Sequence, residues 1–158
     1  MPSVLAQNFL RVLYAGNMAY HTSAFIHFSF RQPLMISKLS TRQHSKTPSI
    51  ASSPAGDEWH YDIMAYLGYI NVPYALLAGQ RLYRLIVSEG SEEPSETDLD
   101  ILALCVLAAA NASQAYGNFA RSRGSGRWIM GEGWDRITVL DALFTVLDVF
   151  AVWKLVKR

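Results

Sequence analysis

The sequence predicts an all-α protein, a four-helix up-down bundle that crosses a membrane four times and forms one helical domain over residues 1–158. Charged residues make up only 17% of the chain, against about 25% in ordinary soluble domains. A membrane-spanning helix needs about 20 mostly apolar residues. The first, second and fourth of four such segments have this length, and the third reaches it only when its amide-rich second half is included. Each segment also carries polar residues at helical spacing on one side, and a bundle lets such sides face one another. The segments cover residues 3–30, 58–87, 99–120 and 134–156.

The first segment is apolar at most positions, but Arg11, Asn17 and His21 interrupt it. Asn17 and His21 are four residues apart and therefore share one side of a helix. Proline disfavours helical backbone in the residue before it, so Pro33 marks the predicted end of this helix. Residues 34–57 follow and are rich in Ser, Thr and Pro. We expect them to form a mobile surface loop.

The second segment is predicted to begin after Asp57, whose side chain can accept a hydrogen bond from a backbone N–H of the first turn. Pro73 should kink the helix, and Gly68 should allow a neighbouring helix to approach closely. Of the residues on one side of this helix, Asn71 and Arg81 are expected to face inward. The residues on that side are His60, Met64, Leu67, Asn71, Tyr74, Ala78 and Arg81.

The third segment follows an acidic connection, and Thr97 or Asp98 is predicted to cap its N-terminus. Its first half is apolar, whereas Asn111, Gln114 and Asn118 place three amides on one side of its second half. Such amides commonly form hydrogen bonds between helices in a membrane. The connection after this segment has several glycines, but not at the spacing of a phosphate-binding loop.

The last segment places Asp141 and Asp148 seven residues apart, which is two turns, so both lie on one side of the helix. Thr138 and Thr145 lie on the same side. Apolar residues occupy most of the remaining circumference, which is typical of a helix that contacts lipid or lies at a centre. A carboxylate at mid-bilayer costs on the order of 3 kcal/mol. Both aspartates are therefore predicted to face inward.

Antiparallel packing of the first and last helices would bring their charged groups to matching depths. On this basis His21 is expected near Asp141, and Arg11 near Asp148. In the simplest interpretation these contacts are structural, an ion pair and amide hydrogen bonds that fix the order of the helices. The protein would then be a scaffold, a chaperone or an accessory subunit.

Two further interpretations remain open. In the first, the bundle is a membrane-embedded acid/base enzyme, of the isomerase or cyclase kind, that acts on a lipid-soluble substrate. A desolvated carboxyl group can keep its proton, so Asp141 would act as acid or base, His21 as its partner, and Asp148 as a further catalytic group. In the second, the same site binds or transports a small hydrophobic molecule or a proton without chemistry. The residues expected to contact substrate or ligand are Asn71, Tyr74, Asn111, Gln114 and Arg11.

Composition argues against several other classes of protein. The net charge of +1 provides no field that would attract nucleic acid, and the lone Cys105 excludes an intrachain disulfide. The four histidines include no helical i,i+4 pair, so we expect no metal site, and a haem held by His21 and His60 is a weaker alternative. No cofactor is predicted. The expected partners are the lipid bilayer and either a small hydrophobic ligand or another membrane protein.

Basic residues predict how the chain is oriented in a membrane. The first and third connections lie on the same side of a four-span protein, and both are basic, whereas the second connection has no basic residue. The positive-inside rule then places the first and third connections in the cytosol and both termini outside or in a lumen. The basic C-terminal tail argues against this orientation. The basic residues of the two connections are Arg31, Lys38, Arg42, Lys46, Arg121, Arg123, Arg127 and Arg136.

Overall fold

The computed structural model describes residues 4–39, 56–87, 96–121, 123 and 136–157. Within these residues the chain is almost entirely helical and contains no strand, so the all-helical prediction is confirmed for them. The elements are α1 (Val4–Phe30), α2 (Gln32–Leu39), α4 (Glu58–Val87), α5 (Thr97–Tyr116), the π-helical turn η2 (Gly117–Arg121) and α7 (Arg136–Val156).

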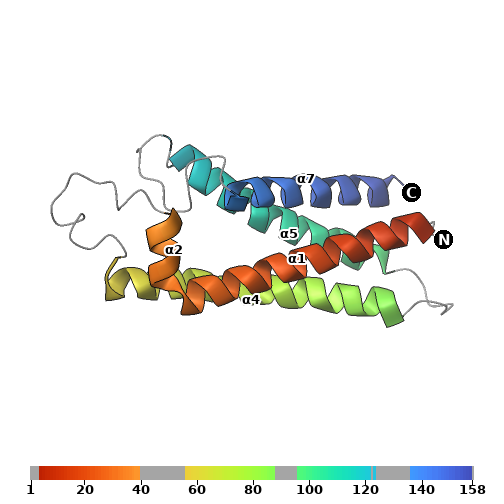
Figure 1. Ribbon diagram of the computed structural model, residues 1–158. Helices are drawn as coiled ribbons and strands as arrows, with labels where there is room; N and C mark the ends of the chain where they lie inside the picture. The colour runs from red at the N-terminus through yellow and green to blue at the C-terminus, as the bar shows by residue number, and fades with distance from the viewer. Residues whose placement is uncertain (1–3, 40–55, 88–95, 122, 124–135, 158) are drawn as a thin grey trace.

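The four long helices form two antiparallel pairs. α1 packs against α4 and α5 packs against α7, each along much of its length. α1 begins and α7 ends at the same end of the bundle, so the chain runs up and down its length (Figure 1). Close backbone approaches between the two pairs are few. Side chains therefore bridge most of the distance between the pairs.

Small residues let α1 and α4 lie close together. A Cβ atom on Gly68 would lie 2.8 Å from the backbone nitrogen of Ser29 and 3.1 Å from the carbonyl carbon of Phe28, and would collide with the Ser29 hydroxyl. Further along the pair, a Cβ on Gly79 would lie 3.1 Å from the sulfur of Met18. The close helix approach that the sequence predicts at Gly68 is therefore present, and α1 is the partner.

The predicted start of α4 is confirmed. Asp57 Oδ1 accepts a hydrogen bond of 3.1 Å from the backbone N–H of His60, three residues further on. The predicted cap of α5 is wrong, because Glu96 occupies the position before the helix and makes no side-chain capping bond. Leu67, which the sequence places on the same side of the helix as Asn71, is 40% exposed, while the adjacent Gly68 is buried.

Part of the predicted loop is helical. α2 starts at Gln32 and crosses the end of the α1–α4 pair (Figure 1). Its second residue is Pro33, and proline is tolerated in a first turn because the N–H that it lacks would have no partner within the helix. The same proline thus marks the end of one helix and the start of the next. Residues 40–55 of the predicted loop lie outside the described residues.

The apolar core lies where α1, α4, α5 and α7 meet. Its fully buried members include Ala78 of α4 and Leu104 and Leu107 of α5. Burying a leucine side chain contributes on the order of 2 kcal/mol. The core residues are Leu10, Leu13, Tyr14, Ala78, Ala103, Leu104, Leu107, Ala151 and Leu155.

The outer surface of the bundle is strongly apolar. Val12, Leu76, Leu102 and Val146, one from each long helix, are 73%, 68%, 61% and 65% exposed. Large apolar side chains are also exposed at other positions of all four helices. By length and composition one described helix, Thr97–Ala120, has the properties of a membrane span, a test that the core helix of a soluble protein can also pass.

Candidate functional site

One side of α1 supplies the polar centre of the bundle. Tyr14, Asn17 and His21 are spaced three and four residues apart, and each is 0% exposed. Tyr20, beside His21, reaches toward α7. The partners of these side chains come from α4, α5 and α7, so α1 contacts every other long helix through hydrogen bonds. Most of the buried polar groups lie in three layers along the bundle, whereas Ser29 and Thr138 lie outside them.

The Asp148 layer consists of Asn17, Asn111 and Asp148, which come from α1, α5 and α7. Asn17 Nδ2 donates to Asp148 Oδ1 at 3.0 Å. Asn111 Nδ2 donates to Asn17 Oδ1 at 3.1 Å and to Asp148 Oδ2 at 3.4 Å. All three side chains are 0% exposed. A single layer of two amides and one carboxyl group therefore joins three helices and links the two helix pairs.

The Asp141 layer consists of Tyr20, His21, Asn71 and Asp141. The Tyr20 hydroxyl donates to Asp141 Oδ1 at 2.7 Å, again between α1 and α7. His21 Nδ1 lies 2.8 Å from Asn71 Oδ1, between α1 and α4. Because Asn71 Nδ2 donates to the Leu67 carbonyl, its oxygen is the atom that faces the histidine, and Nδ1 is the donor.

The environment of the other ring nitrogen of His21, Nε2, differs from that of Nδ1. Nε2 is buried and has no hydrogen-bond partner among the described residues. The rings of Tyr20 and Tyr74 pack on the imidazole, with centroids 5.5 and 5.2 Å away. His21 and Asp141 thus share a layer, as the sequence predicts, but Asp141 bonds to Tyr20 and not to His21. Tyr74 contacts His21 through its ring.

The Arg81 layer consists of Tyr14, Arg81, Arg84, Glu96 and Asp100, near the connection between α4 and α5. Arg81 Nε donates to Asp100 Oδ1 at 2.9 Å, and Nη1 donates to Glu96 Oε2 at 2.6 Å. The Tyr14 hydroxyl also donates to Asp100 Oδ1, at 2.9 Å. Arg84 donates to Glu96 Oε1 at 2.7 Å. A buried arginine is thus paired with two acids, and leaving it unpaired would be costly.

The charge state of Glu96 follows from these contacts. The hydrogen bond from Arg84, followed by that from Arg81, lowers the pKa of Glu96 from an ordinary value of 4.5 to about 2. Glu96 precedes the first residue of α5. Its carboxylate therefore stays ionised at neutral pH and ties the N-terminus of α5 to the last turns of α4.

The predicted pairing of Arg11 with Asp148 is wrong. Arg11 Nη2 donates to the backbone carbonyl of Leu85 at 2.8 Å, and Nη1 to Asn8 Oδ1 at 3.4 Å. Leu85 lies in the last turn of α4, where carbonyls lack a partner within the helix and a cation is favourable. The oxygens of Asp148 are already occupied by the two amides.

The remaining predicted site residues are dispersed. Gln114 is half-buried on α5 and takes part in none of the three layers. His60 lies in the first turn of α4 and contacts Asp57. It is eleven residues from Asn71, or about 16 Å along the helix, so His21 and His60 are too far apart to hold one haem. The described residues contain no group of three or more potential metal ligands.

The site predicted from the sequence lacks five members of the layers, Tyr14, Tyr20, Arg84, Glu96 and Asp100. Asp100 carried a usable signal, since it lies four, seven and eleven residues before Leu104, Leu107 and Asn111, on one side of α5. Glu96 had no such signal, because it lies before the helix. Tyr20 lies beside the predicted polar side of α1, and only its long side chain brings the hydroxyl to Asp141.

These features define the protein as a helical bundle with a polar centre and an apolar exterior. No family profile matches the chain, and neither the curated proteins nor the solved structures include a significant match.

Proposed function

We propose that the chain is a four-span integral membrane protein in which three polar layers fix the helix packing, and that it serves as a scaffold or accessory component for another membrane protein. The observation that carries this proposal is the inverted distribution of polarity. Asn17, His21, Asn111, Asp141 and Asp148 are at most 2% exposed, whereas large apolar side chains cover the outside. In water such a surface would be costly, but in lipid it is the favoured one.

Helix length supports the same proposal. α1, α4, α5 and α7 have 27, 30, 20 and 21 residues, and at 1.5 Å per residue each is long enough for a hydrocarbon core of about 30 Å. Part of the polarity that lowers the average hydropathy of α1, α4 and α7 is buried, as at Asn17, Asn71 and Asp148. Asn8, Asp62, Gln80 and Lys154 are exposed, so the outer sides of these helices gain apolar character only where the polar residues face inward.

The bonding of the layers favours a structural role over a catalytic one. Both oxygens of Asp148 accept hydrogen bonds from amides, and Asp141 accepts one from Tyr20. Arg81 is paired with two carboxylates. Groups that satisfy one another in this way hold helices in register, and polar side chains commonly have this function between membrane helices.

The test is the behaviour of the expressed protein toward membranes. We expect it to sediment with the membrane fraction, to resist extraction by sodium carbonate at alkaline pH, and to float with liposomes in a sucrose gradient after reconstitution. Protein that stays in the supernatant without detergent, as a monodisperse species, would refute the proposal.

A membrane-embedded acid/base enzyme is a second candidate. It is favoured by His21 Nε2, a buried atom without a hydrogen-bond partner in the part of the chain that the structure describes. A neutral imidazole with its other nitrogen bonded to an amide oxygen presents a basic lone pair, which is suited to proton abstraction. The discriminating measurement is mass spectrometry of detergent-purified protein. A lipid-soluble molecule that co-purifies with the protein and is lost in His21→Phe would favour the enzyme, and a co-purifying membrane protein would favour the scaffold.

A further inference from the structure

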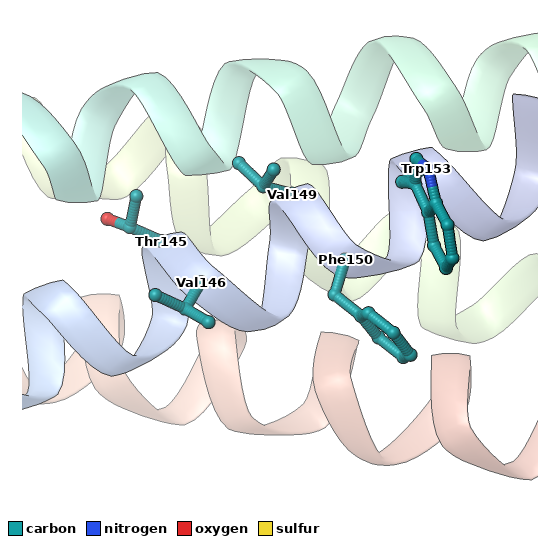
Figure 2. Close-up of a pocket in the computed structure, with 5 residues that line it drawn as sticks. All are labelled: Thr145, Val146, Val149, Phe150 and Trp153. Atoms are coloured by element: carbon teal, nitrogen blue, oxygen red, sulfur yellow. The ribbon is translucent and has the colours of Figure 1, made fainter.

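The outer side of α7 carries a shallow apolar depression of about 440 Å³. Figure 2 shows its lining: Val149 lies on the side toward α5, Phe150 on the side toward α1, and Trp153 at the C-terminal end. Thr145 and Val146 form the other end. From Thr145 to Trp153 the depression follows the helix for about 12 Å. Its walls are therefore a path for an extended apolar chain parallel to α7.

Two lysines lie over the aromatic end of this depression. Lys154 Nζ is 5.5 Å from the centre of the Phe150 ring and 4.9 Å from that of Trp153. Lys157 Nζ is 4.3 Å from the centre of the Trp153 ring. Both lysines are exposed, and neither forms an ion pair with an acid in the part of the chain that the structure describes. The rings that line the depression thus also hold two uncompensated positive charges.

We propose that this part of α7 is a binding site for an anionic phospholipid. The headgroup phosphate binds between Lys154 and Lys157, and one acyl chain lies in the depression along Phe150, Val149 and Val146. The inference rests on the proposed membrane function and extends it, because it assigns one lipid class to one place on the surface.

The order of charged and apolar groups along α7 matches that of an anionic phospholipid. An anionic phospholipid carries its charge at one end and its apolar chain at the other, and α7 presents cations at its C-terminal end followed by an apolar path. Trp153 lies at the boundary between the two, the position that tryptophan favours at a membrane interface. A helix of a partner protein would match the apolar path, but it would complement the lysines only with acidic side chains placed at that end, whereas an anionic headgroup carries this charge itself.

The experiment uses quenching of Trp153 fluorescence by brominated lipids. The three other tryptophans are replaced in a Trp59→Phe, Trp128→Phe, Trp134→Phe protein, which is reconstituted into phosphatidylcholine bilayers that contain either brominated phosphatidylglycerol or brominated phosphatidylcholine. We expect brominated phosphatidylglycerol to quench Trp153 more strongly at equal mole fraction. Each lysine should contribute up to about a fivefold preference for the anionic lipid.

Lysine variants test whether Lys154 and Lys157 cause the preference for the anionic lipid. Lys154→Gln with Lys157→Gln should make the two lipids equally effective. Arg123→Gln is the matched control, since Arg123 also lies over an aromatic ring, that of Phe119, but on another element; it should leave the preference unchanged. Native mass spectrometry of the unmodified protein with both lipids provides a second measurement if the triple tryptophan variant does not fold.

Three outcomes would overturn the inference. Equal quenching by the two lipids in protein that floats with liposomes refutes the headgroup site and leaves the membrane function standing. Absence of quenching by both lipids in protein that floats shows that another polypeptide, or a second copy of the chain, covers α7. Protein that does not float with liposomes refutes the site and the membrane function together.

Discussion

At Asp148, amide groups from two different helices donate to the two oxygens of one carboxyl group. This arrangement gives a single residue of α7 contact with both α1 and α5. Losing one partner of a buried donor costs about 1 to 3 kcal/mol, whereas the net contribution of a hydrogen bond between membrane helices is about 0.6 kcal/mol on average. Removal of one member of the Asp148 layer therefore destabilises the protein mainly because it leaves the polar groups of the other members buried and unpaired.

This asymmetry yields a prediction for Asp148. Asp148→Leu should lower the free energy of unfolding by about 1 to 3 kcal/mol, because Asn17 and Asn111 each lose an acceptor. Asp148→Asn should cost less, since the new amide keeps one acceptor oxygen and its NH₂ group can donate to Asn111 Oδ1, which has no hydrogen-bond partner among the described residues. Unfolding in mixed detergent micelles, followed by circular dichroism, measures both variants. Equal stability of the two variants would contradict this account.

Pairs of helices are held together in two different ways. α1 and α4 approach closely at a glycine, so backbone meets backbone at Gly68 and Ser29. The first pair is joined to the second by side chains of the polar layers, and by the ion pairs between α4 and the start of α5. The contact between α1 and α4 depends on the small side-chain volume at Gly68. The contacts between the two pairs depend on hydrogen bonds and ion pairs. Each can be perturbed separately.

Gly68→Ala tests the close approach. Overpacking of this kind costs about 1 to 3 kcal/mol, which outweighs the gain of about 1 kcal/mol in helix propensity. We therefore expect a lower midpoint of thermal unfolding in detergent for Gly68→Ala. Gly117→Ala is the control, because a Cβ there would meet no atom within 4 Å. A Gly68→Ala protein as stable as Gly117→Ala would rule out the backbone contact.

The contribution of the ion pairs to stability can be tested through the pH dependence of Glu96. Its pKa is lowered on folding, from 4.5 to about 2, by Arg84 and then Arg81. The folded state therefore binds fewer protons than the unfolded state between these values. The stability contributed by the ion pairs is fully present above pH 4.5 and is lost as the pH falls toward 2.

The measurement is the unfolding free energy in detergent at a series of pH values from neutral to about 2. The difference between the wild type and Glu96→Gln should shrink as the pH falls through this window. Glu58→Gln, which changes an exposed glutamate at the other end of α4, serves as the control. If the difference in unfolding free energy between the wild type and Glu96→Gln does not depend on pH, Arg84 and Arg81 do not lower the pKa of Glu96.

On the scale of the whole molecule, the basic connections between the helices are relevant to how the bundle is oriented. The bundle exposes large apolar side chains on all four long helices, and the described ends of α1 and α4 that flank the first connection lie at the same end as the start of α7 (Figure 1). The helix ends that flank the first and third connections therefore lie at one end of the bundle. For the proposed four-span protein, the basic residues of these connections make the orientation in the membrane a separate, testable property.

The positive-inside rule predicts that these two connections are cytosolic. In a Cys105→Ser background, Ser91→Cys in the second connection should react with a membrane-impermeant maleimide added to intact cells. Ser49→Cys in the first connection should react only after the membrane is opened. The reverse pattern would show that the basic C-terminal tail determines the orientation instead.

The sequence alone determined where the four long helices lie and which side of each one carries polar groups. Helical periodicity is a local property, so Asp141 and Asp148, or Asn17 and His21, could be placed on one side from their spacing. The N-cap at Asp57 and the close approach at Gly68 were predictable for the same reason. α2 was not predicted, because Pro33 indicates both the end of one helix and the start of another.

Only the tertiary structure decided which polar groups meet. Asp148 bonds to Asn17 and Asn111 and not to Arg11, and Asp141 bonds to Tyr20 and not to His21. Partner choice depends on the rotation and axial offset between helices, and a shift of half a turn, about 2.7 Å, exchanges one set of partners for another. Residue spacing within one helix carries no information about that offset, so the layers became visible only once the four helices were packed together.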